Sequence, residues 1–181
     1  MHPMNKALPL LAATMLVAGC GGSTSASTTP TTTGARVLPV ATNPITGAPG
    51  PGLKITKALV ENNVSAATGK AADDHLEVAL KNTGGKPLSG VAIYYKITDP
   101  AKKVSEGYYT KLTGFVIKPG GTRIAHFDST GAPDHYPVNK YSLYYTDKNR
   151  LVVEVTAEAV GAGPTMFTVK KDAGSAEAGV E

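Results

Sequence analysis

Residues 75–99 read HLEVALKNTGGKPLSGVAIYYKITD. Leu76, Val78 and Leu80 alternate with more polar residues, a period of two that predicts a strand with one buried face and one wet face. Residues 82–87 then bring Asn, two Gly and a Pro, which favour a turn and end a ladder of hydrogen bonds. A second apolar run follows directly, so the stretch predicts two antiparallel strands joined by a turn.

The same alternation, rich in Val, Ile, Tyr and Thr, recurs along the chain between clusters of Gly, Pro, Asn and Asp. It predicts an all-β domain of about seven strands, and any helix is expected to be short. The expected strands are residues 53–61, 75–82, 88–98, 106–117, 122–128, 141–146 together with 151–160, and 165–171. Residues 141–146 are alternatively an eighth strand. Two packed antiparallel sheets, a β-sandwich, would give such strands a core.

Composition changes sharply along the chain. All 14 acidic residues lie at or after Glu61, and all 8 Tyr and 3 Phe lie between Tyr94 and Phe167. The folded domain is therefore expected over residues 53–171, followed by a disordered tail over 172–181.

The stretch 75–99 resembles the strand, Asn-Thr-Gly turn, strand unit of bacterial immunoglobulin-like domains, including the FxLYD type. Residues 117–122, IKPGGT, are similar to the Pro-Gly corner of the same domains. The resemblance implies an immunoglobulin-like sandwich used in envelope proteins as a spacer, assembly or recognition module. It implies no catalytic residues.

The amino terminus carries the features of a secretory signal peptide over residues 1–19. Lys6 is followed by an uncharged apolar run, residues 7–18, which as a helix would reach about 18 Å, too short to span a bilayer of about 30 Å. Residues 16–20, LVAGC, resemble the lipobox of bacterial lipoproteins. The resemblance implies cleavage before Cys20, a diacylglyceryl thioether on its sulfur, and acylation of the new amino terminus with a fatty acid such as palmitate.

Lipid on Cys20 would hold the mature protein on a membrane, because two long acyl chains are enough for stable anchoring. By resemblance to lipoprotein sorting rules, Gly21 favours the outer membrane where the cell has one. Otherwise the expected location is the outer face of the cell membrane.

Residues 20–52 are expected to be a tether. The run 21–34 contains only Gly, Ser, Thr, Ala and Pro, which cannot offset the entropy of ordering. Residues 36–52 add four prolines and should be extended and stiffer. A flexible chain of this length reaches roughly 30 Å.

Composition also excludes some classes of function. With 1 Cys the chain cannot build an internal disulfide or a Cys-rich zinc site. A formal net charge of +4 is too modest to predict a nucleic-acid partner. No cofactor is predicted.

Two chemical alternatives stay open. His75, His126 and His135 each have a neighbouring carboxylate and could form a periplasmic zinc or copper site, or they are solvated histidines at strand ends. Less favoured is an envelope-polymer hydrolase, because His126, Asp128 and Ser129 lie too close on one strand to converge as a triad. No Gly-x-Ser-x-Gly elbow is present.

Candidate binding residues come from three tyrosine doublets and one long loop. Alternation is expected to send one ring of each doublet to the core and the other outward, where Tyr could contact a sugar or a protein or simply pair across strands. The loop 128–137 is turn-rich, and such loops often carry recognition. The candidates are Tyr94, Tyr95, Tyr108, Tyr109, Tyr144, Tyr145, Asp128, Asp134, His135 and Tyr136.

Together these features predict a membrane-anchored envelope lipoprotein with a non-enzymatic binding or assembly domain. Its expected partner is an envelope protein or a cell-wall polymer.

Overall fold

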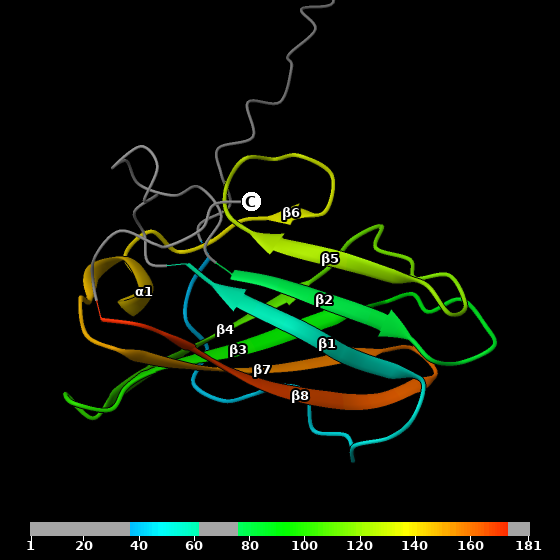
Figure 1. Cartoon of the computed structure of the whole chain (residues 1–181), viewed down its shortest axis with the longest axis horizontal. Helices are drawn as coiled ribbons and strands as arrows, with labels where there is room; N and C mark the ends of the chain where they lie inside the picture. Colours follow the sequence, from blue (N-terminus) through cyan, green and yellow to red (C-terminus); the bar gives the residue numbers. More distant parts are fainter. Residues whose placement is uncertain (1–36, 62–75, 174–181) are drawn as a thin grey trace, which may run out of the picture. The chain divides into compact units, whose positions relative to one another are not determined.

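The structure is a computed structural model that describes residues 37–61 and 76–173. The expected signal peptide, Cys20, His75 and the end of the expected tail lie outside the described residues. Within them the chain forms eight strands and one short helix (Figure 1). The elements are β1 (Leu53–Val60), β2 (Leu76–Asn82), β3 (Ala92–Asp99), β4 (Val104–Lys111), β5 (Thr122–Phe127), β6 (His135–Tyr136), α1 (Leu143–Thr146), β7 (Leu151–Ala159) and β8 (Ala162–Lys171). The prediction of an all-β chain with little helix is confirmed.

The strands form two four-stranded sheets, with orders β1-β2-β5-β6 and β4-β3-β7-β8. All pairings are antiparallel except that of β5 with β6, which is parallel. In the first sheet Val78 on β2 lies opposite Ala58 on β1 and Ala125 on β5. The alternation seen in the sequence of β2 therefore sets the buried face of the whole sheet.

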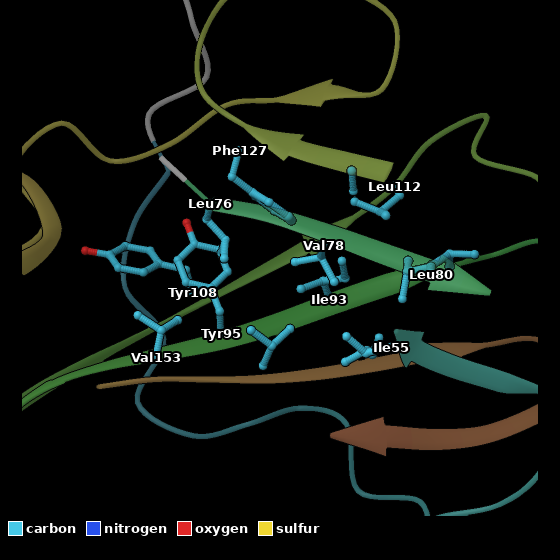
Figure 2. Packing of buried hydrophobic residues seen from close by; sticks show 14 of the residues in the cluster. Ile55, Leu76, Val78, Leu80, Ile93, Tyr95, Tyr108, Leu112, Phe127 and Val153 are labelled. Carbon is cyan, nitrogen blue, oxygen red and sulfur yellow. The ribbon is translucent and has the colours of Figure 1, made fainter. Parts of the chain in front are cut away.

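One hydrophobic cluster receives side chains from both sheets (Figure 2). Val78 and Leu80 of the first sheet are fully buried, as is Ile93 of the second. The Tyr95 ring of β3 meets the Phe127 ring of β5 edge to face, with centroids 5.2 Å apart. Each fully buried aliphatic side chain contributes about 1.5–3 kcal/mol of hydrophobic stabilisation, so this shared cluster couples the two sheets.

The strand expected over residues 141–146 is wrong, because its last residues form the helix α1. Tyr145 and Thr146 both donate their N–H groups to the Ser142 carbonyl at 3.0 Å, which closes a helical turn. The buried ammonium of Lys171 donates to the carbonyls of Tyr144 at 3.3 Å and Asp147 at 3.0 Å. A cation thus satisfies carbonyls that a helix end leaves without an internal partner.

The strand expected over residues 106–117 is also too long. β4 ends at Lys111, and Gly114 adopts a left-handed conformation with φ 76°, which an extended ladder cannot contain. Beyond this turn Ile117 forms an isolated bridge with Leu88. The short strand β6, in the loop after β5, was not predicted.

Residues 37–52, the proline-rich part of the expected tether, lie against the second sheet; we call this segment the strap. The Val40 N–H donates to the Gly107 carbonyl on β4 at 2.8 Å, and the Asn43 side chain donates to the Thr156 hydroxyl on β7 at 3.3 Å. The strap then reaches β8, where Gly50 packs on Gly163. It therefore crosses the sheet from one edge to the other, on the face opposite the core.

No helix within the described residues is long and apolar enough to span a bilayer.

Candidate functional site

The loop after β5 is organised around the carboxylate of Asp128, which is 1% exposed. One of its oxygens accepts from the N–H of Thr130 at 2.9 Å and from the hydroxyl at 3.1 Å. The other lies 2.6 Å from Nδ1 of His135. Asp128, predicted as a binding residue, is thus committed to holding its own loop.

Asp134, the second candidate carboxylate, also has a partner within the fold, the side chain of Arg123. It accepts from the Arg123 guanidinium at 3.0 and 2.5 Å, a two-pronged ion pair. Its backbone is left-handed, with φ 67°, and the ion pair holds it in that turn. Arg123 also lies over the Phe115 ring, 4.5 Å from its centroid, so the pair is part of the packing beneath the loop.

Two of the three predicted histidines come together on β5 and β6. The rings of His126 and His135 stack with centroids 4.5 Å apart and planes 10° from parallel. Nδ1 of His126 is 3.3 Å from Oε1 of Glu77, a carboxylate that is 5% exposed. Each imidazole therefore has its own nearly buried carboxylate.

This arrangement does not resemble a metal centre. Ligands of one ion must aim their lone pairs at one point, whereas stacked parallel rings direct theirs side by side. Within the described residues, no group of three or more His, Cys, Asp or Glu side chains is arranged so that it could hold a metal ion. His75, the third predicted ligand, lies outside the described residues.

The doublets on β3 and β4 place one tyrosine in the core. The rings of Tyr95 and Tyr108 lie 5.3 Å apart, opposite each other in the register of the two strands. Burial raises the pKa of the Tyr95 hydroxyl, and the neighbouring Tyr108, Tyr145 and Glu106 raise it further. Burial also raises the pKa of Tyr108, with Glu106 adding to the effect. These two rings are structural.

The outward members of these doublets are less exposed than alternation suggests. Tyr94 points away from the core, yet only 8% of it is exposed. Its ring lies on Gly107, so close that a Cβ there would fall 2.4 Å from the Tyr94 oxygen. Burial raises the pKa of Tyr94, with Glu154 as a second cause. Tyr109 is half-buried, and burial raises its pKa, with Glu158 as a second cause.

The third doublet lies on α1 rather than on a strand. Tyr144 is buried and donates its hydroxyl to the Glu61 carbonyl, while the half-buried Tyr145 ring packs edge to face on it at 5.2 Å. Tyr136 of β6 is half-buried against Phe127, and burial is the main cause of its raised pKa. These candidate residues again serve packing.

An open groove of about 400 Å³ lies between the strap and β4, and we call it the β4 groove. Strap residues form one wall, β4 forms the other, and side chains of β3 complete it. The lining residues are Pro39, Val40, Ala41, Tyr94, Lys96, Ser105, Glu106 and Gly107. Lys96 supplies a positive charge, and Ser105 supplies a hydroxyl.

Of the predicted candidates, only Tyr94 lines the β4 groove. The sequence patterns did not predict the strap or residues 105–107 as part of a binding site, although the glycine at position 107 indicates a close contact. A glycine inside a strand pattern often marks the close approach of another group, and here that group is the Tyr94 ring. The Glu106 side chain lies on the same face of β4 as the buried Tyr108, where it accepts the Leu143 N–H at the start of α1.

Comparison with known proteins adds little to this geometry. No protein-family model matches the chain, and no curated protein matches it. A red sea bream transglutaminase is similar over 69% of this chain and 17% of its own, at 11% identity and a TM-score of 0.36. Spo0M, a sporulation control protein from Bacillus subtilis, is similar over 68% of this chain and 50% of its own, at 12% identity and a TM-score of 0.35.

A third structure, the Pseudomonas fluorescens alkylpurine DNA glycosylase AlkC bound to DNA, shares 20% identity over 65% of this chain and 30% of its own, with a TM-score of 0.30. This chain thus spans between 17% and 50% of the lengths of the three structures. Likenesses this weak carry no conclusion about function.

Proposed function

We propose that the protein is a lipid-anchored envelope lipoprotein whose strands form an immunoglobulin-like β-sandwich. This sandwich acts as a non-enzymatic binding or assembly module for another envelope component. The observation that carries the proposal is the sequence LVAGC at residues 16–20, directly after an uncharged apolar run. Lipid on Cys20 would anchor the domain to a membrane. Gly21 favours the outer membrane where one exists, and otherwise the anchor lies on the outer face of the cell membrane.

The sandwich is supported by two four-stranded sheets that share one hydrophobic cluster. Its immunoglobulin-like character is supported by the turn at residues 82–87. There the buried Asn82 side chain donates to the carbonyls of Lys86 at 2.7 Å and Ile117 at 3.0 Å. One amide thus ties the Asn-Thr-Gly turn to the Pro-Gly corner, the two segments on which the family resemblance rests.

The binding role is supported by how the polar side chains are used. Asp128 and Asp134 hold the loop after β5, and the rings of Tyr95, Tyr108 and Tyr144 fill the interior. The β4 groove is open and carries the positive charge of Lys96 and the hydroxyl of Ser105. An open, polar hollow on a rigid sheet suits recognition of a partner.

The anchor is tested by growing the native host with an alkyne analogue of palmitate. The full-length protein should incorporate the label and stay in the membrane fraction. Cys20→Ala should abolish labelling and release the protein from the membrane, while Ser23→Ala, a change three residues away in the expected tether, should have no effect. Labelling of the Cys20→Ala variant, or an unmodified thiol in native protein analysed by mass spectrometry, would refute the anchor.

The binding role is tested by photo-crosslinking in intact cells. A benzophenone amino acid at position 38 or 104, beside the β4 groove, should give a discrete crosslinked species. The same amino acid at the exposed position 166 on β8 serves as the control. Crosslinks absent from all three positions would contradict a binding module.

A further inference from the structure

The edge of β4 offers backbone groups to a neighbouring chain. β4 ends its sheet, so its side away from β3 pairs with no strand among the described residues. The Gly107 carbonyl accepts from the strap residue Val40 at 2.8 Å and therefore points away from β3. Backbone groups along a strand alternate in direction, so the N–H and C=O groups of Ser105 and Tyr109 point the same way.

The strap forms hydrogen bonds with few of the outward backbone groups of β4. In the described chain it makes one backbone hydrogen bond to β4, from Val40, and then crosses toward Thr156 on β7. Pro39, the preceding strap residue, has no N–H to donate. The outward backbone groups of Ser105, an exposed residue, therefore border the β4 groove and have no backbone partner within residues 37–61 and 76–173.

The rim of the β4 groove also carries apolar side chains. Leu38, next to the lining residue Pro39, is 61% exposed, and Val104, next to Ser105, is 43% exposed. Large apolar side chains beside unpaired edge groups are the features that proteins usually avoid on a free edge. Lys96, whose side chain is 42% exposed, adds a positive charge on the floor, 3.8 Å from Glu154.

These features favour one class of occupant. A sugar would need an open aromatic face for stacking, and Tyr94 is only 8% exposed because it is pressed on Gly107. An extended polypeptide matches better, since its main-chain amides can pair with the Ser105 edge while alternate side chains meet apolar surface.

We propose that the β4 groove binds an extended peptide segment of a partner protein, which adds to the sheet as a strand beside Ser105. This inference rests on the proposed binding function and selects an envelope protein over a cell-wall polymer as the partner.

The test uses the mature lipidated protein in detergent micelles and a linear peptide selected on it from a phage-displayed library. Ser105→Pro removes one outward N–H and leaves the β3 ladder intact, because proline is tolerated where an edge N–H faces solvent. This variant should bind the selected peptide at least about tenfold more weakly, the equivalent of about 1.4 kcal/mol. A peptide N-methylated at alternate amides should lose binding to the unaltered protein.

A matched pair of variants keeps the test informative if Ser105→Pro folds poorly. Leu38→Ser, at a position 61% exposed, should weaken peptide binding, whereas Met166→Ser on β8, at a position 64% exposed, should not. Circular dichroism and the unfolding midpoint show whether each variant is folded.

Three results would overturn the inference: selection of no peptide, equal binding by all folded variants, or undiminished binding of the N-methylated peptide. Dimerisation of the protein itself, lost in Ser105→Pro, would assign the edge to a second copy and also overturn it. If Ser105→Pro still binds the partner that is crosslinked in cells, the proposed binding function is supported and the proposed peptide site is refuted. If neither a partner nor a peptide is found, both the binding function and the peptide site are refuted.

Discussion

At the scale of single residues, the contact between Tyr94 and Gly107 explains why an outward tyrosine is buried. The register places Lys96 opposite Gly107 and Tyr94 opposite Tyr109, so the Tyr94 ring reaches diagonally onto the glycine. A glycine lowers strand stability, and the ring that covers it compensates by packing. The pair also forms part of the floor of the β4 groove.

Gly107→Ala should lower the free energy of unfolding by about 1–2 kcal/mol, because the added methyl group must displace the Tyr94 ring. In a Tyr94→Ala background the same change should cost much less, since the clash is gone. Chemical denaturation of the four proteins in this cycle measures the coupling. Gly85→Ala, at a glycine whose added Cβ would meet nothing within 4 Å, is the control. Additive effects of the two changes would contradict the contact.

Tyr95 should make the protein sensitive to alkali. Burial raises its pKa in the folded state, whereas in the unfolded chain a tyrosine ionises near pH ~10. Above that pH the folded state holds more protons than the unfolded state, so stability falls as pH rises, by about 1.4 kcal/mol per pH unit for each such group. Urea unfolding between pH 9 and 11.5 should show a shallower decline for Tyr95→Phe. An unchanged slope would mean that this hydroxyl is not kept neutral.

At the scale of elements, loops are held to strands by buried side chains, and Asp99 at the end of β3 is an example. It accepts from the Ala101 N–H at 2.7 Å and from the Asn149 side chain at 2.8 Å. Lys102 bridges the same region through its ion pair with Asp147 at 2.8 Å. The β3–β4 turn is thereby joined to the segment that follows α1.

Asp99→Asn should reduce the loss of stability in acid. Burial alone would raise the pKa of Asp99, but hydrogen bonds from Asn149, Lys102 and Ala101 outweigh it and lower the pKa to about 2. The folded pKa lies below the unfolded value, so this contribution is present above about pH 4 and is lost as pH falls toward 2. Thermal unfolding at a series of pH values should give a flatter acid limb for the variant. An acid limb as steep as that of the unaltered protein would contradict this role.

The strap depends on glycines that allow backbones to meet. A Cβ at Gly163 would lie 2.4 Å from the Cα and the N of Gly50, and backbone atoms cannot move away as a side chain can. Proline at positions 44, 49 and 51 stiffens the segment, so its ordering costs less entropy than that of the Ser/Thr run before it.

Gly163→Ala should therefore displace the strap from β8 and destabilise the protein by about 1–3 kcal/mol. Hydrogen exchange should become faster in residues 43–52 while the β3 and β7 amides stay protected. The neighbouring change Ala162→Gly, which adds no atom, tests whether the effect is steric. Unaltered hydrogen exchange in the strap of the Gly163→Ala variant would show that the contact between Gly50 and Gly163 leaves room for a methyl group.

At the scale of the whole molecule, the described strands should unfold as one unit. Val78 of the first sheet and Val155 of the second are both fully buried in the same cluster, so neither sheet has a core of its own. Small single domains with one core usually unfold in a single transition.

Val78→Ala and Val155→Ala should each lower the free energy of unfolding by about 1–3 kcal/mol, from lost burial and the cavity left behind. Both should shift one common transition, followed in parallel by far-ultraviolet circular dichroism and by tyrosine fluorescence. Ser129→Ala, in an exposed loop position, should leave it in place. Two separate transitions would show that the sheets are independent units.

Much of the strand layout could be predicted from local pattern. The alternation of Leu76, Val78 and Leu80 predicts the buried face of β2, and the structure confirms it. The same rule failed at residues 141–146, where three tyrosines and a leucine suit a strand as well as a helix. Tertiary contacts favour the helix at this position. The Tyr144 ring is buried, and the Lys171 ammonium lies over that ring and donates to the Tyr144 carbonyl.

The candidate site was predicted less well, because side-chain type does not reveal what a side chain touches. Asp128 and His135 stand out in the sequence as candidate binding residues, yet they bind each other. Tyr94 was a candidate as a member of a tyrosine doublet. The β4 groove that it lines depends on the strap, a segment more than 50 residues away in the chain with no strand pattern of its own.

The sequence by itself determined the class of the fold and most strand positions, since periodicity and turn residues act over neighbouring positions. It also carries the lipoprotein-like motif at Cys20. Only the tertiary structure decided the order of the strands in the two sheets, the course of the strap and the position of the β4 groove. These depend on contacts between residues far apart in the chain, and a one-dimensional pattern holds no record of such distances.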